Sequence, residues 1–134
     1  MSQQYAPPGH GMVSEYQAAG VPFVSSSASM VNANTVERFT FPYVTRHVTI
    51  FNSGSTPVRV GFTQNGVFSN PDSNYFLVLA NSNTPRLELK CDEIFVRKDA
   101  GTDPNIVSII AGLTTIPLKN FFTMSGSNGV VGVG

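Results

Sequence analysis

Hydrophobic and polar residues alternate twice within HVTIFNSGSTPVRVGF, residues 47–62. The alternating apolar positions are Val48, Ile50, Val58, Val60 and Phe62. A period of two is typical of a strand that buries one face. Turn-forming residues, NSGSTP, fill positions 52–57 between the two runs. The segment therefore predicts a β-hairpin.

Similar runs recur through the middle of the chain, each bounded by Gly, Pro, Asn, Asp or Ser. The segments expected to form strands are residues 35–42, 44–52, 57–63, 74–80, 85–91, 92–98 and 105–112. They follow one another at intervals of roughly 8–12 residues, which is typical of antiparallel sandwiches and barrels. No amphipathic helix is expected between them. The pattern predicts an all-β antiparallel sandwich of about eight strands.

The two ends of the chain differ from this body. Residues 1–34 combine Gln, Ser, Ala, Pro and Gly with scattered aromatic residues and show neither a strand nor a helix period. They predict an extended N-terminal arm, within which Val21, Phe23 and Val24 form a short strand or an anchor. We expect three regions: an arm at 1–34, a β-domain at 35–122 and a Gly/Val-rich tail at 123–134.

Composition narrows the function classes. The 134 residues fit a single domain, and only 12% of them are charged, with eight basic and eight acidic side chains. A balanced charge gives no electrostatic attraction to nucleic acid, whereas low net charge favours association with other proteins. No apolar run approaches the length of a membrane span, and the N-terminus lacks the features of a signal peptide.

The single cysteine, Cys91, continues the alternation of Leu87 and Leu89 and is expected to be a small buried hydrophobe. With one cysteine, no disulfide within the chain is possible, so the sequence suits a reducing compartment.

Residues that carry catalysis are not grouped in this sequence. The two histidines, His10 and His47, form no H-x-H or H-x-D/E pair, and no carboxylates are paired as in a glycosidase. A nucleophile elbow of the form G-x-S-x-G is also missing. We therefore expect no catalytic, cofactor-binding or metal-binding residues, no small-molecule substrate, and a protein that is not an enzyme.

The stretch HVTIFNSGSTPVRVGFTQNGVFSNPDSNYFLVLANSNTPRLELKCDEIFVRKDAG carries a resemblance to a known family. It resembles the penton (vertex) proteins of tailless icosahedral large double-stranded DNA viruses, over residues 35–112. The resemblance implies a single jelly roll, without cofactor, that forms a pentamer in the virion at each capsid vertex after assembly in the host cell. It also implies contacts with neighbouring major and minor capsid proteins.

On this interpretation, aromatic residues are expected to make the subunit contacts. The candidates are Tyr5, Tyr16, Phe23, Phe51 and Phe68. The alternative hypothesis is a β-sandwich binding module for a host receptor or glycan on a virion or tail, with its site in the loop at 68–74. The long arm and the Gly/Val tail favour the capsid hypothesis, because isolated binding domains seldom carry both.

Overall fold

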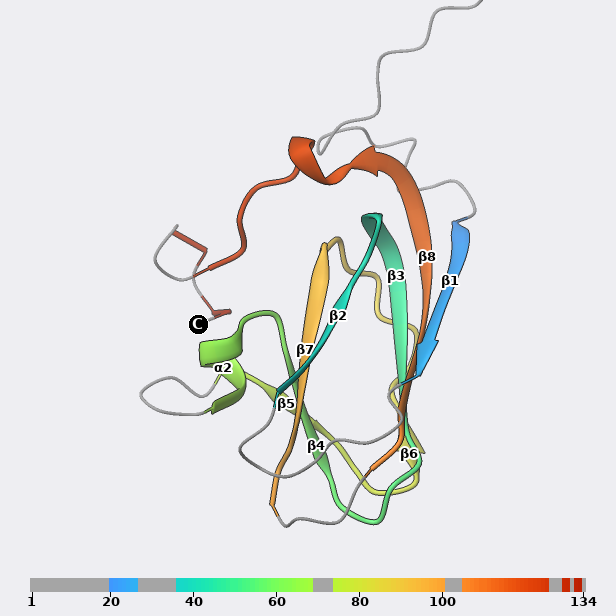
Figure 1. Ribbon diagram of the computed structural model, residues 1–134, viewed down its shortest axis with the longest axis vertical. Coiled ribbons are helices and arrows are strands. Elements are labelled where there is room, and N and C mark those ends of the chain that lie inside the picture. Colours follow the sequence, from blue (N-terminus) through green and yellow to red (C-terminus); the bar gives the residue numbers. More distant parts are fainter. Residues whose placement is uncertain are drawn as a thin grey trace, which may run out of the picture.

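The computed structural model describes residues 20–26, 36–68, 74–100, 105–125, 129–130 and 132–133. Over these ranges the chain is all-β, with two antiparallel sheets and almost no helix (Figure 1). The strands are β1 (Val21–Ser26), β2 (Val36–Thr40), β3 (Tyr43–Asn52), β4 (Val58–Gly61), β5 (Phe76–Val78), β6 (Ser82–Asn83), β7 (Glu93–Lys98) and β8 (Val107–Pro117). A short helix, α2 (Gln64–Phe68), follows β4, and a 3-10 turn, η1 (Leu118–Asn120), follows β8. The predicted all-β class is confirmed.

The strands pair in a nested order. Sheet A has the order β1-β8-β3-β6, and sheet B has the order β2-β7-β4-β5. The first strand therefore pairs with the last, the second with the seventh, the third with the sixth and the fourth with the fifth. Pairing of β3 with β8 and of β4 with β7 completes the two sheets.

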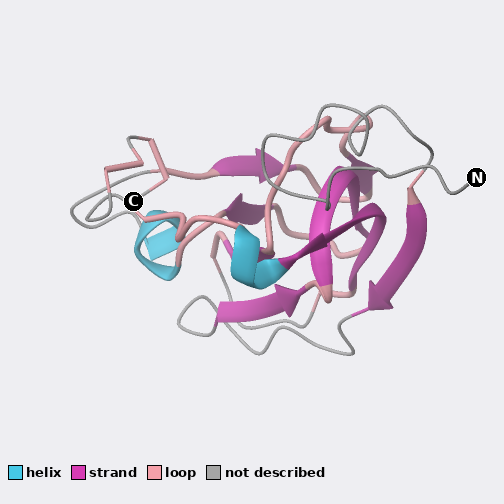
Figure 2. Ribbon diagram, turned by 90° about the horizontal axis from the view of Figure 1, so that it is seen from above, coloured by secondary structure: helices cyan, strands magenta, loops and turns pink. Residues whose placement is uncertain are grey.

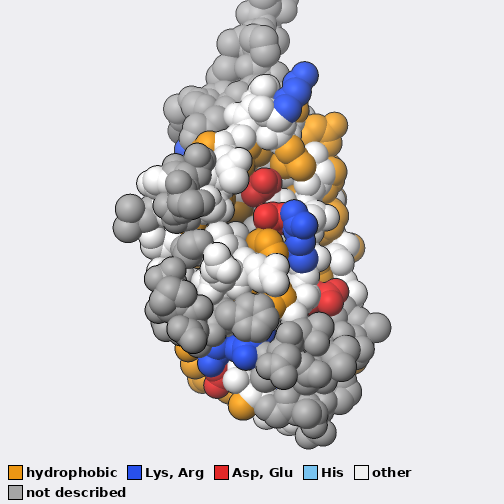
Figure 3. Space-filling model, turned by 60° about the vertical axis from the view of Figure 1, so that its left-hand side comes forward, with side chains coloured by type: hydrophobic (Ala, Val, Ile, Leu, Met, Phe, Trp, Pro, Cys, Tyr) orange, Lys and Arg blue, Asp and Glu red, His pale blue; other side chains and the backbone are white. Residues whose placement is uncertain are grey.

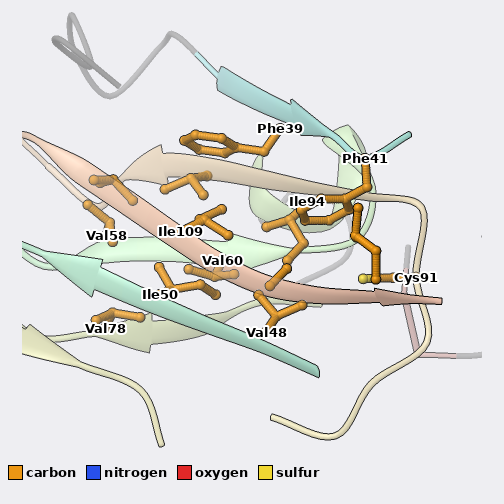
Figure 4. Close-up of a cluster of buried hydrophobic side chains, with 14 residues drawn as sticks. Phe39, Phe41, Val48, Ile50, Val58, Val60, Val78, Cys91, Ile94 and Ile109 are labelled. Atoms are coloured by element: carbon orange, nitrogen blue, oxygen red, sulfur yellow. The ribbon is translucent and has the colours of Figure 1, made fainter. Parts of the chain in front are cut away.

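One hydrophobic core lies between the sheets, as in a β-sandwich. Sheet A contributes the alternate side chains Val48, Ile50 and Ile109, while sheet B contributes Val58 and Val60. All five are at most 1% exposed, and Figure 4 shows their side chains directed into a shared layer. Burying each such side chain stabilises the fold by about 1.5–3 kcal/mol relative to leaving it in water. The apolar positions read from the sequence are therefore the ones that hold the sheets together.

The predicted hairpin at 47–62 is wrong. β3 lies in sheet A and β4 in sheet B, so residues 53–57 cross from one sheet to the other. Alternation of apolar and polar residues shows which side chains point into the core. The same alternation occurs whether two strands pair within one sheet or pack against each other from opposite sheets. Here Val48 and Val58 approach the core from opposite sheets.

The strand predicted at 85–91 is also wrong. In this segment Leu87 alone forms a bridge, with Val48 of β3, and its backbone hydrogen bonds to Val48 measure 2.8 and 2.9 Å. Elsewhere the strand boundaries differ from those expected: β5 covers only 76–78, whereas β8 continues beyond 112 to Pro117.

The side chain of Asn52 ties two sheet crossings together. Its amide nitrogen donates to Thr56 O at 2.9 Å, in the crossing from β3 to β4, and to Val78 O and Leu79 O at 3.2 Å, where β5 leads towards β6. Its oxygen accepts from the Gly54 N–H at 3.0 Å. Asn52 is only 2% exposed, so these bonds satisfy a polar group inside the protein.

Asn105 adds the third crossing, from β7 to β8. Its amide nitrogen donates to Thr56 O at 2.6 Å and to Asn52 Oδ1 at 3.3 Å. A Cβ on Gly54 would overlap the Asn105 side chain, so the crossing loop passes there only with glycine. The turn from β5 to β6 contains Asn81 with a φ of 51°, a left-handed conformation that asparagine tolerates better than most residues.

Helix α2 lies beside sheet B, near the C-terminal end of the chain (Figures 1 and 2). Thr63 precedes it and accepts a hydrogen bond from the Gly66 N–H at 2.9 Å. The same hydroxyl donates to the carbonyl oxygen of Val133 at 2.5 Å, so the part of the Gly/Val tail that the structure describes lies against its own subunit.

Strand β1 confirms the short strand expected around Val21, Phe23 and Val24. It lies inside the segment assigned to the arm, and it pairs with β8 from Val21↔Leu113 to Ser26↔Ser108. The remainder of the predicted arm, residues 1–19 and 27–34, lies outside the described residues.

We expect Asn52→Ala to lower the free energy of unfolding by about 2–4 kcal/mol, because it leaves several buried backbone groups without their partner. Chemical denaturation monitored by far-ultraviolet circular dichroism would measure the loss. The matched control is Asn83→Ala, which removes the same side chain from an exposed position. Equal stability of the two variants would contradict a central role for Asn52.

Candidate functional site

Charged side chains on the described surface form ion pairs. Arg38 donates to Glu93 with an Nε–Oε2 distance of 2.7 Å, and Arg86 pairs with Glu88 through its own Nε at 2.8 Å. Figure 3 shows acidic and basic side chains side by side near the middle of one face, with no extended basic patch there. On this face (Figure 3) the acidic and basic side chains are interspersed rather than gathered into the extended basic patch that attracts a nucleic-acid backbone.

The part of the outer face of sheet B that lies over β4 and β7 is covered by α2 and by arginine side chains. Arg59 and Arg97 both donate to the carbonyl oxygen of Val67 in α2, at 3.2 and 3.4 Å. Arg59 also binds Asp99 at 2.8 Å and lies 4.5 Å above the ring of Tyr75. Because these contacts use the outward positions of β4 and β7, the face is occupied by the subunit itself.

Among the described residues, no three His, Cys, Asp or Glu side chains are close enough to hold a metal ion. His47 lies on β3 opposite Gly112 of β8, and its ring fills the space that a Cβ at Gly112 would need. Partial burial lowers the pKa of His47, and the nearby Arg86 lowers it further, so this imidazole is neutral near pH 7.

Cys91 is fully buried, as the sequence predicts. Its N–H donates to Thr45 Oγ1 at 3.0 Å, and its sulfur lies 3.3 Å from the same oxygen. Burial raises the pKa of the Cys91 thiol to about 12, although the Thr45 hydrogen bond opposes the shift. A thiol that stays protonated is neither a nucleophile nor a metal ligand.

The outer face of sheet A differs from that of sheet B because the strands β1, β8 and β3 present it to solvent largely without charged side chains. The ion pair of Arg86 and Glu88 lies at its β3 edge, near His47. Across β1, β8 and β3, the strand positions that point away from the core run from Pro22 on β1 to Phe51 on β3. None of these outward positions holds Lys, Arg, Asp or Glu. Val24, Ile106, Ile110 and Phe51 are 73%, 50%, 41% and 40% exposed. We call this surface the open face. Apolar side chains gathered on one face are typical of a surface that binds another protein.

A groove lies next to the open face, where the edge strands β5 and β6 meet. Its volume is about 410 Å³. Phe76, Val78 and Leu87 are among its apolar lining residues, and Leu77 and Leu79 are exposed beside them. Uncharged polar residues, Ser82, Asn83 and Thr84, complete the lining. We call this the edge groove.

The predicted contact residues fall in different places. Phe51 lies on the open face, whereas Phe23 is half-buried with its ring 5.2 Å from that of Phe41 in an edge-to-face contact. Phe68 ends α2, and its side chain lies outside the described part of the structure, as do Tyr5 and Tyr16. Most of the loop proposed for the alternative binding site, at 69–73, lies outside it too.

Three exposed apolar residues of these surfaces, Ile110, Leu77 and Leu79, were not predicted from the sequence. Ile110 follows the buried Ile109 directly, so an apolar side chain occupies an outward position of a strand. Leu77 and Leu79 similarly flank the buried Val78. Two consecutive apolar residues in a strand were the available signal, but consecutive apolar residues also occur in strands that are buried on both faces.

Comparison with protein-family models, curated proteins and solved structures finds no match for this chain. Across the described residues, no helix is long and apolar enough to cross a membrane.

We expect Cys91 to be unreactive towards a thiol reagent such as Ellman's reagent in the native protein at pH 8, because its thiol is buried and protonated. One thiol per chain should appear on unfolding in guanidinium chloride. Ile106→Cys is the matched control, since it places a second thiol at a position that is 50% exposed and should react at once. Rapid labelling of the native wild-type chain would contradict the burial of Cys91.

Proposed function

We propose that this chain is a structural capsid subunit, a single jelly roll that assembles as the pentamer at an icosahedral vertex. The observation that carries the proposal is the nested strand order. Pairing of β1 with β8, β2 with β7, β3 with β6 and β4 with β5 is what results when one long antiparallel hairpin is rolled across two sheets. This strand order supports a jelly roll, an eight-stranded architecture that occurs in viral capsid proteins, lectins and cupins.

Side-chain chemistry favours the capsid class over the cupin class. A cupin-type enzyme uses a cluster of metal-binding side chains, and the described residues contain no such cluster. A capsid subunit instead needs apolar surfaces that other subunits cover, and the open face and the edge groove are surfaces of this kind. The low overall charge, with eight basic and eight acidic residues, also favours association.

The proposed place of action follows from the same hypothesis. The subunit would be assembled in the host cell and reside at the vertex of the virion, bound to its own copies and to neighbouring major and minor capsid proteins. A ring of five identical subunits is heterologous, so each subunit uses two different surfaces, one for each neighbour. The extended arm expected at the N-terminus would add contacts outside the ring.

We expect the purified protein at micromolar concentration to form a closed ring of five 14.4 kDa chains. Native mass spectrometry would give the number of chains, and negative-stain electron microscopy would show the fivefold symmetry. A protein that remains strictly monomeric over the same concentrations, under several salt conditions, would contradict the proposal.

The second candidate function is attachment to a host receptor or glycan. The edge groove favours it, because its volume of about 410 Å³ lies within the range of small-ligand sites and Ser82, Asn83 and Thr84 offer hydrogen-bonding groups. A monomer that binds to a glycan array and loses binding in Asn83→Ala would support attachment instead of assembly.

A further inference from the structure

The edge groove and strand β1 lie on opposite flanks of the two-sheet body. In sheet A, β1 forms one edge and β6 the other, while in sheet B β5 forms an edge. The groove contains residues of both β5 and β6, so these two edges lie on the same flank. Strand β1 therefore occupies the flank away from the groove. Two different surfaces on opposite flanks are what a heterologous ring requires.

Strand β1 is a rigid edge with apolar side chains. Val21 and Val24 are 55% and 73% exposed, and Val24 is the most exposed of the large hydrophobic residues in the described chain. The strand is held by six register pairs with β8 and by a 2.8 Å hydrogen bond between Ser26 and Ser108. A Cβ on Gly20 would lie 2.6 Å from the Cα of Gly112, so the start of the strand packs closely on β8. A preformed edge loses little conformational entropy on binding.

The edge groove is concave, whereas β1 is a projecting edge, and both carry apolar side chains. Phe76, Val78 and Leu87 supply an apolar interior, and Ser82 and Asn83 supply uncharged polar groups beside it. An apolar centre with a polar rim is typical of protein–protein interfaces. A volume of about 410 Å³ exceeds that of one valine side chain, so the groove has room for an apolar side chain from a strand edge.

The β1 segment and the groove lining both lack charged side chains, which makes them compatible with each other. The sequence has no Lys, Arg, Asp or Glu between Glu15 and Glu37, and the residues that line the groove are likewise uncharged. When such surfaces meet, no charge has to be removed from water without a partner, which would cost several kcal/mol per ion. By contrast, the outer face of sheet B carries Arg38 and Glu93 and would lose their hydration on contact.

We propose that the β1 edge of one copy, through Val21 and Val24, docks into the edge groove of the next copy around Leu77 and Leu79. The inference rests on the proposed ring and identifies the two flanks that form it. Each subunit then donates one β1 edge and accepts another, so that repetition of a single contact closes the ring. The open face stays outside this contact, apart from Val24 at its margin, and remains available to other capsid proteins.

The proposal is tested by cross-linking the full-length double variant Val24→Cys, Leu79→Cys with a short bismaleimide. Both positions are exposed, and the buried Cys91 contributes no background in the native state. We expect a ladder of covalent oligomers that ends at the ring size measured by native mass spectrometry. Each single variant should give no ladder, because the contact joins residue 24 of one copy to residue 79 of another.

A matched control pair is Val24→Cys, Leu118→Cys, in which the second cysteine is also at an exposed leucine but outside the groove. An intact ring in which the test pair cross-links no better than this control would overturn the β1–groove contact and leave the proposed ring standing. A chain that is monomeric by mass and gives no ladder would overturn both. A glycan that occupies the groove of an intact ring without blocking the ladder would also overturn the docking of β1 there.

A charge exchange provides independent evidence. Val24→Lys and Leu79→Glu should each reduce the ring population at least tenfold, because each places one unpaired charge in an apolar contact. The two substitutions combined in one chain should restore the ring, since the lysine of one copy then meets the glutamate of the next. Failure of the combined variant to recover, with both single variants folded by circular dichroism, would count against the contact.

Discussion

The hydrogen bonds of Asn52 are the interaction on which the arrangement of the two sheets depends. Because β3 lies in one sheet and β4 in the other, the backbone between them must cross from sheet to sheet. In such a crossing the backbone N–H and C=O groups lose the partners that they have within a sheet. Asn52 binds the crossing after β3 through Thr56 and the end of β5 through Val78 and Leu79. Asn105 joins the crossing before β8 to the same cluster. One buried polar group thus fixes three connections at once.

With the crossings fixed, the two outer faces of the body become different from each other. On the outer side of sheet B, the Val67 carbonyl of α2 accepts hydrogen bonds from Arg59 and Arg97. These two arginines therefore bind groups of their own subunit. In the described chain no helix covers sheet A, and the outward positions where β1, β8 and β3 pair hold uncharged side chains. An assembling protein needs this asymmetry, because a ring must present some surfaces to neighbours while the rest stay hydrated.

Alternation in the sequence predicted the class of fold and most of the core. Val48, Ile50, Val58 and Val60 are buried as expected, and Cys91 is the small buried residue that its position in the pattern indicated. The partner of each strand was not predicted. Residues 47–62 have the pattern of a hairpin, yet the turn-forming segment between their strands makes a crossing, because Asn52 and Gly54 bind each other and the neighbouring crossings rather than closing a turn.

The candidate surfaces show the same division. The sequence by itself determined the low charge and most of the buried positions, since these depend on residue type and spacing alone. Only the tertiary structure decided that Val24, Ile110 and Phe51 share an open face, and that Leu77 and Leu79 border a groove on the flank opposite β1. The physical reason is that strand pairing joins residues far apart in the chain. Whether an outward apolar side chain is covered depends on those distant partners and not on its neighbours in sequence.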